Sequence, residues 1–215
     1  MNKTIFCVVF ILAMIFVFVG CSNHSNPKDA EDYLKNKYGE NFYLYSSVSS
    51  SFDQPYDQIF LYSDSHPNDI VTVYYQNGKY TDNYYGILVY DKFFNVLDDT
   101  LRKNLKQYKF YYQFNNSNYN GLSNPENFEE DFSKNASYFE PKIFVYVKKI
   151  DTITENEFHK IASEFKNMGI NGFISIYELS SDDYNSINSS NVESFLNNHY
   201  DINSTYYTWF RNYNN

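Results

Sequence analysis

Cys21 is the residue whose neighbours most clearly indicate a chemistry. It follows a basic residue near the start of the chain, Lys3, then an uncharged apolar run over residues 5–19, and the small residue Gly20. A basic start, an apolar stretch and a small residue at its end are the three parts of a secretory signal peptide. The apolar run is 15 residues long, shorter than the roughly 20 that a membrane-spanning helix needs. Residues 1–20 are therefore predicted to be a cleaved signal peptide rather than a permanent span.

The four residues Phe18-Val19-Gly20-Cys21 resemble the bacterial lipobox, in which a small residue precedes an invariant cysteine. Phe18 departs from that pattern, because the position three before the cysteine is usually Leu. The resemblance implies transfer of a diacylglyceryl group to the Cys21 thiol and cleavage between Gly20 and Cys21. Only a thiol among these side chains could be alkylated in this way, and two acyl chains are enough for stable anchoring. The alternative, an uncleaved anchor or an ordinary signal that happens to precede a cysteine, stays open.

The other cysteine of the chain, Cys7, lies inside the segment that would be removed. The mature chain then has no thiol free for a disulfide, so its fold must be held by its core alone. For the same reason the sequence excludes a metal–thiolate cluster and a cysteine nucleophile.

Histidines and paired acids are the remaining candidates for metal binding or acid–base catalysis. The histidines lie far apart in sequence and lack the spacing of two ligands on one helix, so local sequence assembles no zinc site. The acidic pairs lack the glycine-containing alternation of a calcium loop, and adjacent acids on a helix point to different faces. We therefore expect solvated surface here, and assign no metal, cofactor or catalytic residue. The histidines are His24, His66, His159 and His199, and the pairs are Asp98-Asp99, Glu129-Glu130 and Asp182-Asp183.

Motifs of enzymes are missing from the sequence. The chain has neither a glycine-rich phosphate loop nor a serine flanked by glycines as in a nucleophile elbow. Carboxylates of glycosidases and peptidases can nevertheless come from distant positions that form no motif. A surface hydrolase acting on cell-wall glycan or peptide is therefore the alternative to a non-catalytic function.

Charge and aromatic content narrow the classes of partner. The mature chain would carry 16 basic and 26 acidic residues, a formal charge of −10. This acidity argues against nucleic acid and against adsorption to anionic headgroups, so membrane attachment would depend on the lipid at Cys21. The chain has 24 Tyr and 20 Phe, and exposed rings could form a platform for a glycan or peptide. The bias of an AT-rich genome, together with the strand-forming tendency of tyrosine, accounts for them more simply.

Hydrophobic periodicity predicts the elements that must position these residues. The helix expected at 27–38 has acids in its first turn and Gly39 after its end, and the helix expected at 155–168 begins with a capping box of Thr154 and Glu157. Further helices are expected at 93–108 and 191–199, a turn of helix at 125–132, and strands at 42–48, 58–62, 70–75, 84–90, 109–114, 142–148, 173–179 and 205–210.

These elements predict an α+β fold, with antiparallel or mixed sheets and amphipathic helices packed on one face. Residues 21–28 would be the lipidated cysteine and a short tether. The rest would divide into a subdomain over 29–114, a polar linker over 115–138 and a second subdomain over 139–215. Both subdomains contain a strand, an amphipathic helix and a strand, so two similar β-α-β-containing halves are one interpretation.

The lipobox-like signal, the Tyr/Asn/Lys-rich composition and the segment Tyr33-Leu34-Lys35-Asn36-Lys37-Tyr38-Gly39 resemble uncharacterised small lipoproteins of low-GC Gram-positive bacteria. The resemblance implies a lipid-anchored protein on the extracytoplasmic face of the cell membrane and carries no activity. The function predicted is a non-catalytic binding or interaction module, in which an aromatic sheet face meets a protein or peptide partner. A toxin-neutralising immunity lipoprotein is one version of it.

Overall fold

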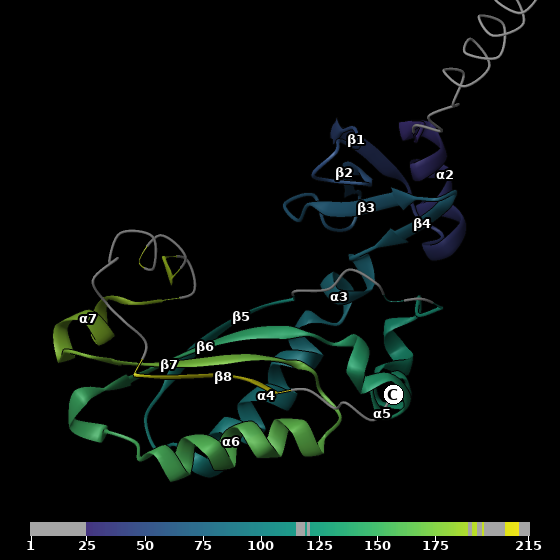
Figure 1. Cartoon of the computed structure of the whole chain (residues 1–215). Helices are drawn as coiled ribbons and strands as arrows, with labels where there is room; N and C mark the ends of the chain where they lie inside the picture. Colours follow the sequence, from purple (N-terminus) through teal and green to yellow (C-terminus); the bar gives the residue numbers. More distant parts are fainter. Residues whose placement is uncertain are drawn as a thin grey trace, which may run out of the picture.

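The computed structural model describes residues 25–114, 119, 121–188, 191–192, 195 and 205–210. Within them the chain forms two four-stranded sheets, one with the order β1-β2-β3-β4 and one with the order β5-β6-β7-β8 (Figure 1). Helices pack against these sheets, and the predicted α+β class is confirmed. The signal peptide, Cys21 and the tether as far as His24 lie outside the described residues. No helix in the described ranges is long and apolar enough to cross a membrane.

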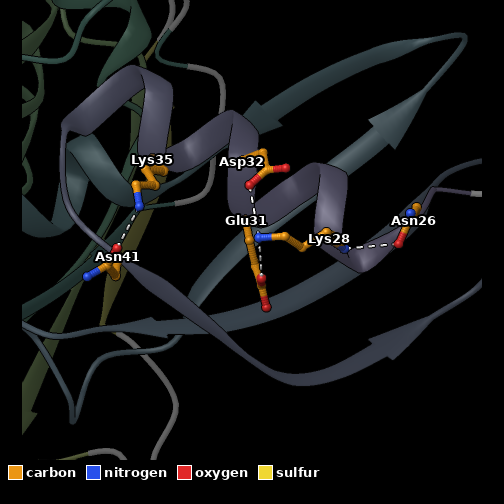
Figure 2. Close-up of polar contacts among 6 residues, drawn as sticks. All are labelled: Asn26, Lys28, Glu31, Asp32, Lys35 and Asn41. Atoms are coloured by element: carbon orange, nitrogen blue, oxygen red, sulfur yellow. Dashed lines mark hydrogen bonds and ion pairs between the residues drawn. The ribbon is translucent and has the colours of Figure 1, made fainter.

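Helix α2 (Pro27–Tyr38) opens the described chain and has local reasons to form (Figure 2). The Asn26 side chain caps its first turn by accepting a hydrogen bond from the Lys28 N–H at 3.0 Å, and Pro27 stands at its start. Gly39 ends the helix in the left-handed conformation, with a φ of 80° that glycine adopts without strain. The predicted bounds of this helix are confirmed.

The first sheet is an antiparallel meander against which α2 packs. Ala30 and Leu34 of the helix are fully buried, in one core with Ile59, Leu61 and Val73 of the sheet. The helix therefore covers one face of this sheet. Its strands are β1 (Phe42–Val48), β2 (Asp57–Ser63), β3 (Val71–Gln76) and β4 (Lys79–Asp82).

The face of the first sheet opposite α2 carries aromatic side chains. Tyr43 and Tyr62 are opposite each other in register, their ring centroids lie 5.4 Å apart, and they are 41% and 36% exposed. Tyr74 lies on the same face and packs edge-on against the ring of Tyr56 at 5.4 Å. This face of the first sheet therefore presents stacked and partly exposed aromatic rings.

Residues 84–90, predicted as a strand, instead form the short helix α3 (Tyr84–Leu88) and the start of the next helix, so this prediction is wrong. Aromatic and β-branched residues favour strands intrinsically, but tertiary contacts override that preference. The Asp82 carboxylate accepts a hydrogen bond from the Tyr84 N–H at 3.0 Å and so starts the turn. Tyr84 then packs in the core of the first sheet and Tyr85 in the core of the second. Helix α3 therefore connects the two cores.

The second sheet contains one parallel pair of strands. β5 and β6 are antiparallel, β6 and β7 are parallel, and β7 and β8 are antiparallel. Between the parallel strands the chain passes through η3 (Lys149–Asp151) and α6 (Glu155–Asn167), which begins with the predicted capping box of Thr154 and Glu157. The predicted β-α-β unit is confirmed, and α6 packs beside α4 (Tyr90–Asn104) on one face of the sheet (Figure 1). The strands are β5 (Lys109–Phe114), β6 (Pro141–Lys148), β7 (Gly172–Leu179) and β8 (Tyr206–Phe210).

The predicted linker over 115–138 contributes to the core of the second sheet. Phe128 is buried, and with Phe139 it belongs to the same hydrophobic cluster as residues of α4. The segment is polar on average, and this average conceals its few large apolar residues. Strand β5 also pairs with β6. The predicted division into 29–114 and 139–215 therefore does not follow the sheets. We call α2 with β1–β4 the first subdomain, and the elements from α4 onward the second subdomain. The helical turns in this segment are η1 (Pro125–Asn127), α5 (Phe128–Asn135) and η2 (Ala136–Tyr138).

The segment after β7 covers part of the second sheet's other face. It begins with α7 (Ser181–Ser186) and continues to Ile187 and Val192, which are buried in a small cluster with Tyr146 of β6. Most of the helix predicted at 191–199 lies outside the described residues. The closing strand predicted at 205–210 is confirmed as β8.

Candidate functional site

A cleft of about 740 Å³ lies around strand β5 at the edge of the second sheet. Helix α4 forms one wall with Tyr90 and Phe94, and the segment after α7 forms the other with Ile187 and Val192. Its volume falls within the roughly 300–1,000 Å³ that is usual for ligand pockets. We call it the β5 cleft. Its apolar and aromatic lining consists of Tyr90, Phe94, Phe110, Tyr111, Tyr146, Ile187 and Val192.

Ring stacking fixes the α4 wall of the β5 cleft and the rings of β5 itself. On the side of α4, Phe94 stacks on Phe110 with 4.4 Å between ring centroids, and Tyr90 stacks on Tyr112 at 4.6 Å. On the other face of the sheet, Tyr111 lies over Phe144 in the paired strand β6. Stacked aromatic pairs of this kind add attraction beyond the burial of their area. The α4 wall and the rings of β5 are therefore held in place before any ligand arrives.

The backbone of β5 is available along the cleft. In the described sheet, β5 has β6 as its only strand neighbour (Figure 1). In an edge strand, alternate residues direct their N–H and C=O groups away from the sheet. Since an apolar wall stands on each side of this edge, a ligand can find backbone hydrogen bonds and apolar contacts together.

Among the described residues, Tyr146 contributes a buried hydroxyl without a partner to the lining of the β5 cleft. It is 1% exposed, its ring stacks on Tyr177 at 5.5 Å, and its hydroxyl has no hydrogen-bond partner among the described residues. Burial, followed by the neighbouring Tyr177 and Tyr111, raises the pKa of this hydroxyl well above its ordinary value, so it stays protonated. The hydroxyl of Tyr112, on the other face of the sheet, instead donates to the Tyr90 carbonyl at 2.8 Å. Tyr146 therefore holds an unused donor just beneath the lining of the cleft, which a ligand reaches only when the side chains that cover it move.

Some charged side chains around the β5 cleft are hydrogen-bonded within the protein, and one is exposed. Lys109 donates to the carbonyl oxygens of Tyr184 and Ile187, both at 2.6 Å, so its ammonium ties β5 to the outer wall. Asp98 accepts a hydrogen bond from the Tyr108 hydroxyl at 2.6 Å. Asp91, in the first turn of α4, is exposed at the cleft. The accessible charge of the cleft is thus negative.

No protein-family model matches the chain, and no curated protein matches it. Among solved structures, a DUF5037 family protein from Ruminococcus gnavus ATCC 29149 is similar with a TM-score of 0.42 and 16% identity, over 84% of this chain and 89% of that one. Similarity at this level assigns neither a family nor a function.

A second polar cluster lies in the first subdomain, where Glu40, Ser65, His66 and Tyr84 meet. Both Glu40 oxygens accept hydrogen bonds, one from the Tyr84 hydroxyl and one from the Ser65 hydroxyl at 2.5 Å. His66 Nδ1 lies 3.0 Å from each of the same two hydroxyl oxygens. Because both hydroxyl hydrogens already point to Glu40, Nδ1 must be the donor to them. The Ser65 hydrogen is therefore not directed at the imidazole, as a serine nucleophile requires.

Asp82, also in the first subdomain, is a buried carboxylate with a structural role. It accepts hydrogen bonds from the hydroxyls of Tyr33 and Tyr38 at 2.8 and 2.7 Å, and from the Lys37 ammonium at 2.7 Å. Burial, and then the charge of Asp82, raise the pKa of both tyrosines far above the ordinary value. The carboxylate is paired with the Lys37 ammonium and the two tyrosine hydroxyls stay protonated, so this cluster holds α2 to the sheet and has no group free for chemistry.

The other sequence candidates are not brought together. His159 is exposed, 3.5 Å from Glu155 on the same helix, as expected for a solvated histidine. His24 and His199 lie outside the described residues, and the described ones hold no group of three or more His, Cys, Asp or Glu side chains suited to a metal ion. The acidic pairs lie on α4, α5 and α7. Sequence reasoning missed Tyr146 altogether, since only its alternation within a strand was visible.

Proposed function

We propose that the chain is a lipid-anchored binding module of the bacterial cell envelope, whose β5 cleft takes up an extended peptide segment of a partner protein. The observation that carries this proposal is the edge of β5, which has no second strand neighbour in the described sheet and lies between an aromatic wall and an aliphatic wall, with the buried Tyr146 hydroxyl lacking a partner among the described residues. An extended peptide that adds to a sheet edge gains main-chain hydrogen bonds, while the walls select its alternate side chains. A backbone carbonyl of the peptide would accept from Tyr146.

Charge refines the kind of peptide. Asp91 is exposed at the cleft, whereas the Lys109 ammonium is occupied by two carbonyls. A peptide with a basic side chain near Asp91 and apolar or aromatic side chains toward the walls therefore fits best. The acidic chain as a whole, with a formal charge of −9 before any cleavage, would attract such a segment at long range.

Peptide binding can be tested without knowing the natural partner. Random nonapeptides displayed on phage would be panned against the mature chain carrying Cys21→Ser, and the selected peptides would be resynthesised with single N-methyl groups along the backbone. Strand addition predicts that N-methylation weakens binding at alternate positions, because only every second N–H faces β5. Uniform tolerance of N-methylation would contradict strand addition.

A matched pair of variants locates the site. Tyr111→Ala removes a ring from the β5 cleft, and Tyr43→Ala removes a similarly stacked ring from the outer face of the first sheet. We expect Tyr111→Ala to raise the dissociation constant of a selected peptide by about tenfold and Tyr43→Ala to leave it unchanged. The reverse result would move the site to the aromatic face of the first sheet.

The lipid anchor is the second part of the proposal, supported by the lipobox-like residues Phe18-Val19-Gly20-Cys21. Cells fed labelled fatty acid should incorporate the label into the wild-type chain and not into Cys21→Ser. The variant should also leave the membrane fraction. Equal labelling of the two chains would refute lipidation at Cys21.

Hydrolysis of wall glycan or peptide is the second candidate, favoured by the meeting of Glu40, Ser65 and His66. It predicts turnover of purified wall fragments that is abolished by Ser65→Ala or His66→Gln. The hydrogen-bond directions described above favour the binding module, which predicts no turnover by the wild-type chain.

A further inference from the structure

Asp57, at the start of β2, fastens the beginning of the described chain to the loop between β1 and β2. One carboxylate oxygen accepts a hydrogen bond from the Ser25 N–H and the other from the Ser50 N–H, both at 2.6 Å. Asp57 is 4% exposed, and hydrogen bonds to a charged acceptor in such a setting are stronger than neutral ones. Ser25, just before α2, and Ser50, just after β1, are therefore held side by side.

The reach of the chain places the anchor close to this clamp. Cys21 precedes Ser25 by four residues, and four fully extended residues span at most about 14 Å. A lipid on Cys21 would thus keep Ser25, and with it Ser50, within that distance of the bilayer surface. This step rests on the proposed lipidation of Cys21.

The loop after Ser50 presents a phenylalanine at its tip. Ser51 and Gln54 exchange backbone hydrogen bonds, with N···O distances of 2.7 and 3.2 Å, so the chain makes a tight turn between them. Phe52 and Asp53 occupy the two central positions, and Phe52 is 101% exposed. A hydrogen-bonded turn therefore holds a large apolar side chain entirely in water.

Other apolar groups lie at the same end of the first sheet. Val48, the last residue of β1, is 48% exposed and stands in register with Gln58, which in turn is opposite Tyr74. Tyr56 packs against the ring of Tyr74. A single exposed apolar residue needs no explanation. Phe52, however, lies at the same end of the first sheet as Val48, Tyr56 and Tyr74, beside the end of the chain that would carry the lipid.

We infer that the turn with Phe52 at its tip is a membrane contact, which dips into the interfacial layer of the bilayer and orients the lipid-anchored chain. Aromatic rings favour this layer, and the acyl chains supply the anchoring that one ring cannot. The neighbouring Asp53 limits the depth to the headgroup region. Figure 1 shows the second subdomain, to which β5 belongs, on the far side of α3 from the start of the described chain. Because the β5 cleft is lined by residues of that subdomain, this orientation holds the cleft away from the membrane.

Spin labelling tests the contact directly, because the mature chain has no thiol besides the lipidated Cys21. The full lipidated chain would carry Phe52→Cys, with Ile150→Cys as the matched control, since Ile150 is 84% exposed but lies on η3 in the second subdomain. Each nitroxide-labelled chain would be reconstituted into vesicles of phosphatidylethanolamine and phosphatidylglycerol. Electron paramagnetic resonance then compares collisions with oxygen and with a water-soluble nickel complex.

Two samples are compared: the lipidated chain in vesicles, and the Cys21→Ser chain in detergent-free buffer. The inference predicts that the label at position 52 collides more often with oxygen, and less often with the nickel complex, in the vesicle sample. The label at position 150 should be unchanged. If the chain floats with the vesicles but both labels collide with oxygen and with the nickel complex as they do in buffer, the membrane contact is overturned and the lipid anchor stands. A wild-type chain that takes up no fatty acid and does not float would refute the anchor, and the inference with it.

Discussion

Removing the Tyr146 hydroxyl should stabilise the free protein while weakening its binding. An unpartnered buried polar group costs about 1–3 kcal/mol, and the Tyr146 hydroxyl is such a group. Tyr146→Phe keeps the ring and its stacking on Tyr177, so we expect the free energy of unfolding to rise by about 1 kcal/mol. For a chain of this size that corresponds to roughly 2–4 °C in the melting temperature. Selected peptides should bind the variant more weakly, because their carbonyl loses its donor.

Tyr112→Phe is the matched control. Tyr112 is also 1% exposed, in the neighbouring strand, but its hydroxyl donates to the Tyr90 carbonyl at 2.8 Å. Its removal should lower the free energy of unfolding by about 0.5–1.5 kcal/mol. Urea denaturation of both variants, with equal slopes, gives the comparison. A loss of stability in Tyr146→Phe as large as that in Tyr112→Phe would refute the reasoning, because it would mean that the hydroxyl is already satisfied in the free protein.

Three further substitutions test the packing and the caps, each by urea denaturation. Asp57→Asn should lower the free energy of unfolding by about 1–3 kcal/mol. Burial raises the pKa of Asp57, but the hydrogen bonds from the backbone N–H groups of Ser25 and Ser50 outweigh it and bring the pKa below its ordinary value. The wild-type carboxylate therefore stabilises the fold above about pH 4, and it stabilises the fold less as the pH falls. The difference in unfolding free energy between the wild type and Asp57→Asn should thus shrink in acid. A difference that does not depend on pH would contradict this. Gly86→Ala would place a Cβ 2.8 Å from the Tyr119 hydroxyl oxygen and should cost about 1–3 kcal/mol, whereas an unchanged midpoint would show that the ring moves aside freely. Thr154→Ala removes the cap of α6 and should cost about 1 kcal/mol, with Thr154→Ser close to the wild type.

Elements with strong local signals were predictable from the sequence. The helix α2 has an asparagine cap, a proline at its start and a glycine at its end, and α6 has its capping box of Thr154 and Glu157, so short-range chemistry alone defines them. The segment 84–90 was not predictable in this way. Its residues favour a strand. It is helical because the Asp82 carboxylate accepts a hydrogen bond in its first turn, and because Tyr84 and Tyr85 pack into two cores built from residues that are distant in sequence.

The candidate site was harder to predict than the fold. Strand β5 was expected at the right residues, but its position at a sheet edge depends on pairing with β6 across more than 25 residues, counted from Phe114 to Pro141. The doublet Tyr111-Tyr112 was visible, yet the sequence does not say which ring faces the cleft and which the core. The missing partner of the Tyr146 hydroxyl is a property of the packed structure and leaves no trace in the sequence.

Amide hydrogen exchange in β5 tests the central claim most directly. The mature chain would be measured alone and with a saturating amount of one panned peptide. Binding at the β5 cleft predicts slower exchange at alternate residues of Lys109–Phe114, because their outward N–H groups become bonded to the added strand. Unchanged exchange in β5, with protection confined to β1 and β2 of the first sheet, would contradict it.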